Sequence, residues 1–263
     1  MSWLEQEIQQ AQRDGVRHAD NLPYLLTPDR GNGQGVLLIH GFGASPRELR
    51  PLADALVRHH FTVAGVRLPG HGTSPQDLRK RRHQEWLDAA SKGYQALTRM
   101  QLQVSLCGLS TGALVSLFLA ARQPIERLVL LAPFLRLRHH LAPYAGLLSP
   151  FLPYQKRVIS ETERDFYYSR RPLRGIHQIN LLRRRLPAIL PRITAPTLVL
   201  TSTGDATIAP GTAQALFALL GSRDKVLHIY GDEVPHVLTT SDNPQLDDVL
   251  ARCVHFLEGN TIS

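Results

Sequence analysis

Short and almost wholly apolar runs recur along this chain, and a stretch with helical spacing of its apolar residues follows most of them. Runs of this length are typical of strands that a parallel sheet buries on both faces. They are GVLLIH (35–40), FTVAGVRL (61–68), LQVSLC (102–107), RLVLLA (127–132), PTLVLTS (196–202) and KVLHIY (225–230). No other feature limits the fold as strongly, because repeated strand–helix units predict an α/β fold with a mostly parallel sheet and helices on both faces.

The stretches between these runs supply the helices. They are expected at 45–60, 83–100, 111–122, 210–220 and 244–258. The first of them carries start signals: Ser45 is predicted to be the N-cap, Pro46 the first helical residue, and Glu48 the residue that completes a capping box.

The alternation breaks between residues 133 and 192, where prolines are scattered and short, bent helices are expected. This segment holds 12 Lys and Arg against 3 Asp and Glu, a net charge of +9, whereas the rest of the 263-residue chain holds 18 against 19. It also holds 7 of the 15 Phe and Tyr residues. We therefore predict a cap subdomain at 133–192, laid over the sheet edge and inserted into a core formed by 1–132 and 193–263.

The sequence CGLSTGALVSLFLAAR (107–122) turns a predicted strand into a predicted helix at one residue, Ser110. Gly108 and Gly112 flank this corner at positions where side chains would collide. The corner residue itself has to adopt a sparsely populated backbone conformation. We interpret Ser110 as a nucleophile held out at the carboxyl edge of the sheet, where open parallel sheets bind ligands.

A nucleophilic serine needs donors for the negative charge that develops on the oxygen of the carbonyl it attacks. Thr111 would begin the helix after Ser110, where N–H groups lack intrahelical partners and the helix dipole favours negative charge. The glycine-containing loop HGFGAS (40–45) follows another predicted strand and lets the backbone approach the same place. The N–H groups of Phe42 and Thr111 are predicted to form this oxyanion hole, whereas His40 is expected to shape the loop.

The serine also needs a base, and the base needs a carboxylate that orients it. Of the 12 histidines, His236 follows the last predicted strand and precedes the last helix, at the correct edge of the sheet. Asp205 follows the preceding strand at the same edge. Asp232 and Glu233 are rivals, but they share the loop of His236 and are less independently placed. The predicted catalytic residues are therefore Ser110, Asp205 and His236.

With these motifs the chain resembles the α/β-hydrolase superfamily, and within it the bacterial carboxylesterases and monoacylglycerol lipases. The resemblance rests on HGFGAS, LPGHGTS, GLSTGA, APTLVLTSTGDATI and PHVLTTSDNP, and it runs from about residue 22 to residue 258. It implies that G-x-S-x-G is a nucleophile elbow and that the triad has the chain order Ser, Asp, His. It also implies an oxyanion hole formed by the backbone of Phe42 and Thr111.

The expected reaction is hydrolysis of short- to medium-chain acyl esters or monoacylglycerol-like substrates through an acyl-enzyme. Phe134, Leu137 and Tyr144 of the cap are predicted to bind the acyl chain. A thioesterase or an acyltransferase would use the same triad. A non-catalytic ligand-binding protein on this fold is a further alternative, although such proteins usually lose or slow the triad.

Composition and charge indicate which partners the chain could bind. The +9 segment is consistent with a peripheral contact of the cap with an anionic membrane, but a solvated arginine-rich face is the simpler interpretation. No run of about 18 apolar residues is present, so no membrane span is expected, and the polar N-terminus favours a cytoplasmic location. No motif indicates a metal, a cofactor or a nucleic acid. The oligomeric state is left open.

Overall fold

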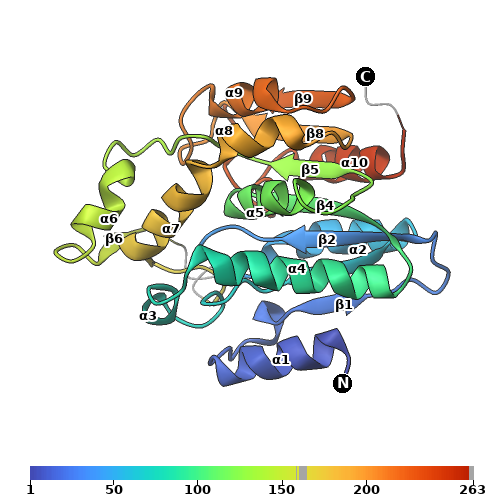
Figure 1. The fold of residues 1–263 in the computed structure, drawn as a ribbon, viewed down its shortest axis with the longest axis horizontal. Helices are drawn as coiled ribbons and strands as arrows, with labels where there is room; N and C mark the ends of the chain where they lie inside the picture. Colours follow the sequence, from blue (N-terminus) through green and yellow to red (C-terminus); the bar gives the residue numbers. More distant parts are fainter. Residues whose placement is uncertain (158, 160–164, 261–263) are drawn as a thin grey trace.

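Among the residues that the computed structural model describes, 1–157, 159 and 165–260, seven strands form the main sheet. The strand order is β1-β3-β2-β4-β5-β8-β9, and every pairing is parallel except that of β1 with β3. The strands are β1 (Tyr24–Leu26), β2 (Gln34–Ile39), β3 (Thr62–Val66), β4 (Gln103–Leu109), β5 (Leu128–Leu131), β8 (Thr197–Ser202) and β9 (Lys225–Tyr230). The prediction of a mostly parallel sheet is confirmed (Figure 1).

Helices cover both faces of this sheet (Figure 1). One face carries α4 (His83–Arg99), α5 (Thr111–Ala120) and α9 (Thr212–Leu219), and the other carries α2 (Arg50–Arg58) and α10 (Leu246–Leu257). Successive side chains of β2 alternate between the two cores: Leu37 and Ile39 pack in the first, and Val36 and Leu38 in the second. Because both faces of β2 are buried, neither set of alternate side chains faces solvent, and this explains why its sequence is apolar.

The helix expected at 45–60 begins later than predicted. Residues Pro46–Leu49 form the 3-10 turn η2, and α2 starts at Arg50. The predicted capping box is absent, because the Ser45 side chain makes no capping hydrogen bond and the Glu48 carboxylate accepts the N–H of Gly41 at 2.7 Å instead. Glu48 thus holds the loop after β2 and does not cap its own helix.

The chain begins with an element that was not predicted, α1 (Trp3–Arg13). Its start is a capping box in which Ser2 and Glu5 each accept the backbone N–H of the other. The pattern S-x-x-E at residues 2–5 could therefore have predicted the start of this helix. Asp14, which follows the helix, forms a buried ion pair with Arg67 after β3 at 2.5 Å, and this ties α1 to the sheet.

Between β5 and β8 the chain leaves the sheet and builds a separate layer beyond the carboxyl ends of the strands, on the left of Figure 1. This layer contains η3 (Ala142–Tyr144), α6 (Ala145–Leu148), the antiparallel pair β6 (Tyr154–Lys156) and β7 (Arg170–Pro172), and α7 (Leu173–Arg183). Short helices were expected here, but the hairpin and the 11-residue α7 were not. Residues 158 and 160–164 of the predicted cap lie outside the described residues.

The last part of the predicted cap belongs with the main core. The short elements α8 (Leu186–Ile189) and η5 (Leu190–Arg192) follow α7, and α8 packs beside α5. Leu182, Leu186 and Leu190 are fully buried in the same core cluster as α4 and α5. Leucines spaced four residues apart present one apolar side of the chain to α5, so the segment rejoins the core before residue 193. In the described part of the chain, no helix has the length and apolarity needed to cross a membrane.

Candidate active site

Ser110 occupies the sharp turn from β4 into α5. Its φ of 55° and ψ of −112° lie in a region that residues with a side chain seldom adopt. A Cβ on Gly108 would lie 2.4 Å from the carbonyl oxygen of Gly112, and a Cβ on Gly112 would lie 1.9 Å from that of Ile39. Neither position has room for a side chain, so the two glycines permit the turn that presents the Ser110 hydroxyl.

His236 lies within hydrogen-bond distance of both of its predicted partners. Its Nε2 is 2.9 Å from Oγ of Ser110, and its Nδ1 is 2.5 Å from Oδ2 of Asp205. The other carboxylate oxygen of Asp205 accepts the N–H groups of Thr207 and Ile208 at 2.7 and 3.0 Å. The three side chains come from the ends of β4, β8 and β9, which the parallel topology places at one edge of the sheet.

The environment of Asp205 fixes the proton positions in this triad. Burial by itself raises the pKa of the Asp205 carboxyl, but the hydrogen bonds from His236 and from the backbone outweigh it and hold the pKa below its usual value. The ionised carboxylate therefore accepts the Nδ1 proton of His236, and Nε2 is free to accept the Ser110 hydroxyl. Asp232 and Glu233 are exposed, and among the described residues neither is hydrogen-bonded to His236.

The loop after β2 holds Phe42 at the mouth of the site. His40, fully buried beneath this loop, accepts a backbone N–H on Nε2, so that its Nδ1 donates to the Gly41 carbonyl oxygen at 2.8 Å. Burial lowers the pKa of His40 to about 4, so this residue is neutral and shapes the loop, as expected. Thr111 is the first residue of α5, where the N–H has no partner within the helix.

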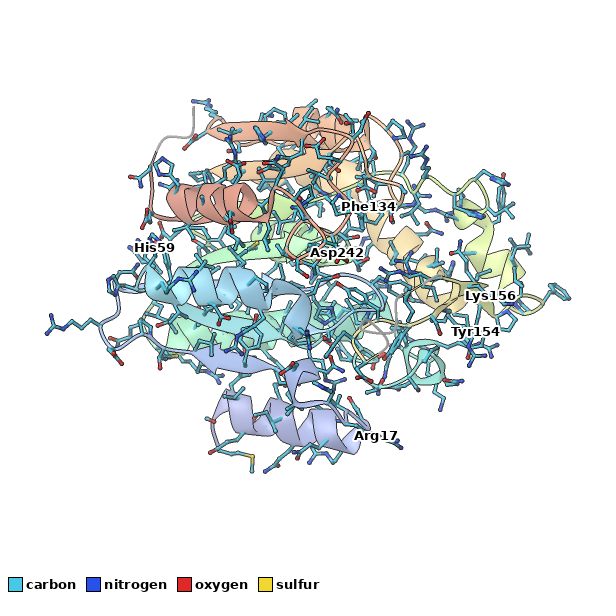
Figure 2. All side chains as sticks on the ribbon, turned by 180° about the vertical axis from the view of Figure 1, so that it is seen from behind. Arg17, His59, Phe134, Tyr154, Lys156 and Asp242 are labelled. Carbon is cyan, nitrogen blue, oxygen red and sulfur yellow. The ribbon has the colours of Figure 1, made fainter. Side chains whose placement is uncertain are left out.

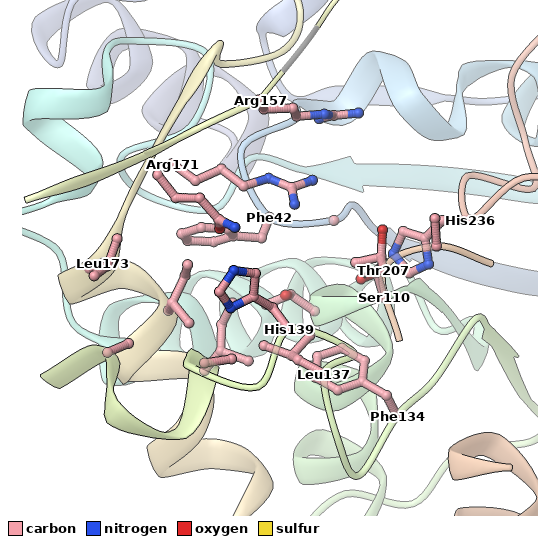
Figure 3. Close-up of a pocket in the computed structure, with 18 of the residues that line it drawn as sticks. Phe42, Ser110, Phe134, Leu137, His139, Arg157, Arg171, Leu173, Thr207 and His236 are labelled. Atoms are coloured by element: carbon pink, nitrogen blue, oxygen red, sulfur yellow. Dashed lines mark hydrogen bonds between the residues drawn. The ribbon is translucent and has the colours of Figure 1, made fainter. Parts of the chain in front are cut away.

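The site opens into a cavity of about 330 Å³ between the sheet edge and the inserted layer (Figure 3). Phe134 and Leu137, which are predicted to bind the acyl chain, line this cavity. Further apolar side chains of the insert surround them: Leu141, Ala142, Ala145, Leu148, Leu152, Leu173, Ile176 and Ile179. The prediction for Tyr144 is wrong, because its side chain is 58% exposed and lies outside the lining. Its neighbours Ala142 and Ala145 turn inward and Tyr144 turns outward.

The polar part of the cavity lining was not predicted from the sequence, and it consists of Glu48, Gln155, Arg157, Tyr167 and Arg171. Glu48 was interpreted as a capping residue, and the two arginines were part of a diffuse basic segment. Their common position depends on the pairing of β6 with β7, for which the sequence holds no clear signal. Within the described ranges, no group of three or more His, Cys, Asp and Glu side chains is placed to hold a metal ion.

A serine, a histidine and an aspartate in this geometry at the carboxyl edge of an α/β sheet define the serine hydrolases of the α/β-hydrolase superfamily. Comparison with known proteins agrees. The model of the family Hydrolase_4, described as serine aminopeptidase, S33, matches residues 32–240, and the chain belongs to this family.

Two curated relatives carry the names of esterases. The thermostable monoacylglycerol lipase of Bacillus sp. (strain H-257) is 30% identical over 197 residues, which cover 73% of this chain and 78% of that protein. The carboxylesterase of Bacillus subtilis (strain 168) is 26% identical over 217 residues, 80% of this chain and 87% of its own. Among solved structures, a chain from a study of the metagenome-derived lipolytic enzymes LipS and LipT superposes with a TM-score of 0.82 at 22% identity, over 92% of this chain and 99% of its own. The fold and the superfamily expected from the sequence are thus confirmed.

Proposed function

We propose that this chain hydrolyses carboxylic esters with Ser110 as the nucleophile. Ser110 attacks the ester carbonyl while Nε2 of His236 takes its proton, and Asp205 stabilises the imidazolium that forms. The N–H groups of Phe42 and Thr111 receive the oxyanion. His236 then protonates the leaving alcohol, and water attacks the acyl-enzyme by the same route. The observation that carries this proposal is the 2.9 Å contact between His236 Nε2 and Ser110 Oγ.

The proposed substrates are short- to medium-chain acyl esters or monoacylglycerols. The apolar lining of the cavity supports a hydrocarbon chain next to the serine, and the printed names of the two curated relatives support an ester bond. In this proposal residues 1–132 and 193–263 form the catalytic core, and the cap at 133–192, whose last part packs on that core, selects the acyl chain through Phe134 and Leu137.

The test is labelling with a fluorophosphonate, which reacts with an activated serine, in the native chain and in S110A. Labelling of the native chain alone is the expected result, and a native chain that stays unlabelled contradicts the proposal. A series of p-nitrophenyl esters from acetate to palmitate then gives the preferred chain length. A thioester of the same acyl group and an aminoacyl p-nitroanilide, run in parallel, separate an esterase from a thioesterase and from a peptidase.

The outer end of the insert also supports a contact with a lipid surface. Phe151 is 88% and Leu147 is 74% exposed there, and Leu141 and Leu152 are exposed while they also line the cavity. Lys156 lies at the same end of the molecule (Figure 2). An apolar tip with a basic neighbour is suited to an anionic membrane, from which an ester would reach the cavity directly.

Co-sedimentation with phosphatidylglycerol vesicles at physiological salt tests this contact. The native chain is expected to bind, and F151D is expected to lose binding because it places a charge at the apolar tip. The control I229D alters an exposed apolar side chain on β9, an edge strand of the main sheet and not part of the insert, and should bind as the native chain does. Absence of native binding, or equal loss in both variants, contradicts the proposed contact.

A further inference from the structure

One side of the catalytic cavity is cationic because of the way in which β6 pairs with β7. In this antiparallel pair Gln155 lies opposite Arg171. Side chains two residues apart share one face of a strand, so Arg157, directly after β6, lies on the face of Gln155 and Arg171. All three line the cavity. The alternate residues Lys156 and Arg170 are exposed on the outer face.

The two inner guanidinium groups make no direct ion pair with a carboxylate of the described residues, although the more distant charge of Glu48 acts on both. Nε of Arg171 is buried without a hydrogen-bond partner in the described part of the chain, and neither Arg157 nor Arg171 forms an ion pair with a described carboxylate. Burial and then the like charge of Arg157 lower the pKa of Arg171 to about 10, so it is still protonated at neutral pH. A partly buried cation without a close ion-pair partner is unfavourable, and a second cation beside it adds repulsion.

Glu48, the carboxylate that shares this cavity, raises the pKa of Arg171 through its charge but accepts no hydrogen bond from either arginine. Glu48 accepts a backbone N–H on one oxygen at 2.7 Å and the Tyr167 hydroxyl on the other at 3.0 Å. The guanidinium of Arg157 lies 4.6 Å from the centre of the Tyr167 ring, which fixes this cation beside the cavity. Both arginines lie on one side of the cavity, with their guanidinium ends turned toward the side on which His236 lies (Figure 3).

We propose that Arg171, together with Arg157, binds an anionic group of the substrate, a carboxylate or a phosphate, so that the preferred esters carry a negative charge. This inference rests on the proposed ester hydrolysis at Ser110 and adds the class of substrate. The anion supplies an acceptor for the unpartnered Nε and lies between two cations that repel each other. A guanidinium suits carboxylate and phosphate because its parallel N–H groups can donate to both of their oxygens at once.

Two pairs of esters that differ by one charged group test the proposal. The anion lies on the acyl part in p-nitrophenyl hydrogen glutarate, compared with p-nitrophenyl pentanoate. It lies on the alcohol part in monodecanoylglycerol phosphate, compared with monodecanoylglycerol. In at least one pair we expect a higher kcat/KM for the charged ester, and the responding pair identifies the source of the anion. In R171Q this preference should fall about 10- to 100-fold, mainly through KM, with partial recovery in R171K.

The variant R174Q is the matched control, since it removes one positive charge from an exposed residue of α7. It should leave the preference within about twofold of the native value. The proposal is overturned if neither pair shows a preference, if R171Q leaves the preference unchanged, or if R174Q lowers it equally.

A binding measurement separates this proposal from the hydrolase function. Calorimetric titration with glutarate and with inorganic phosphate needs no turnover, and binding of at least one anion should be lost in R171Q. A chain that binds the anion through Arg171 but hydrolyses no ester contradicts the proposed function alone. A chain that hydrolyses neutral esters but binds neither anion contradicts this inference alone.

Discussion

Asp205 has two roles, since it orients His236 and it also holds its own loop through backbone hydrogen bonds. Replacement of Asp205 by Asn should remove the first role and keep the second. In the native chain one carboxylate oxygen accepts the Nδ1 proton of His236 at 2.5 Å, and the other accepts the N–H groups of Thr207 and Ile208. An Asn side chain keeps one oxygen for the two backbone donors, so its NH2 group faces Nδ1. Nδ1 must then accept a hydrogen bond, and the ring proton moves to Nε2. Nε2 can no longer take the proton of Ser110.

The expected loss for D205N is about 10⁴-fold in kcat, the size seen when a triad histidine is held in the wrong tautomer. It corresponds to about 5.5 kcal/mol of transition-state stabilisation. The free energy of unfolding should fall by only about 1 to 2 kcal/mol at pH 7, since the loop hydrogen bonds remain. The native pKa of Asp205 lies below the usual 3.8, so its ionised form stabilises the fold above that pH. The advantage of the native chain over D205N should therefore disappear as the pH falls below about 3.8.

Hydrolysis of p-nitrophenyl butyrate measures kcat, and urea unfolding at several pH values measures stability. D232N is the matched control, because Asp232 is an exposed carboxylate in the loop of His236. Its kcat should stay within about twofold of the native value. The reasoning would be refuted if D205N kept more than about a tenth of the native kcat, or if D232N lost as much as D205N.

A Cβ on Gly112 would lie 1.9 Å from the Ile39 carbonyl oxygen, so G112A should not fold and should lack the native near-UV circular dichroism spectrum. G31A, at a position with open space around it, should keep that spectrum. A native spectrum for G112A would contradict this prediction. Burial raises the pKa of Glu48 above its usual 4.5, so the folded state holds that proton more tightly, and the free energy of unfolding should fall relative to that of E48Q as the pH rises above about 4.5. Urea titrations that give a constant difference between the two chains would exclude this. Burial also raises the pKa of the Cys107 thiol, so a thiol reagent should label neither cysteine before urea unfolds the chain; rapid labelling in buffer would show the packing to be wrong.

Glu48 shows how far a local pattern can be trusted. The residues Ser45 and Glu48 have the spacing of a capping box, and the same spacing at Ser2 and Glu5 does form one. At Glu48 the tertiary structure offers stronger partners, a backbone N–H of the loop after β2 and the Tyr167 hydroxyl from the insert. A carboxylate buried between two segments satisfies those donors first, since leaving them unpaired would cost more than an empty helix cap.

The insert was the least predictable segment for a related reason. Its composition indicated a basic and aromatic layer, and Phe134 and Leu137 were expected in the cavity. Tyr144 was assigned to the cavity by its residue type, but η3 turns that side chain outward. Which face a short helix buries depends on the elements that it packs against, and short elements carry too few turns to show that face in their sequence.

The strand–helix alternation and the nucleophile turn could be predicted from the sequence, because both depend on neighbouring residues: apolar runs that suit strands buried on both faces, and glycines two positions before and after Ser110. Topology was needed to bring His236 to Ser110 across 126 positions and to Asp205 across 31. Strands that run parallel end at one edge whatever their separation in the chain, so order along the sequence predicted these partners. The cationic side of the cavity could not be predicted in this way, since the placement of Arg157 and Arg171 depends on a strand register that no local pattern specifies.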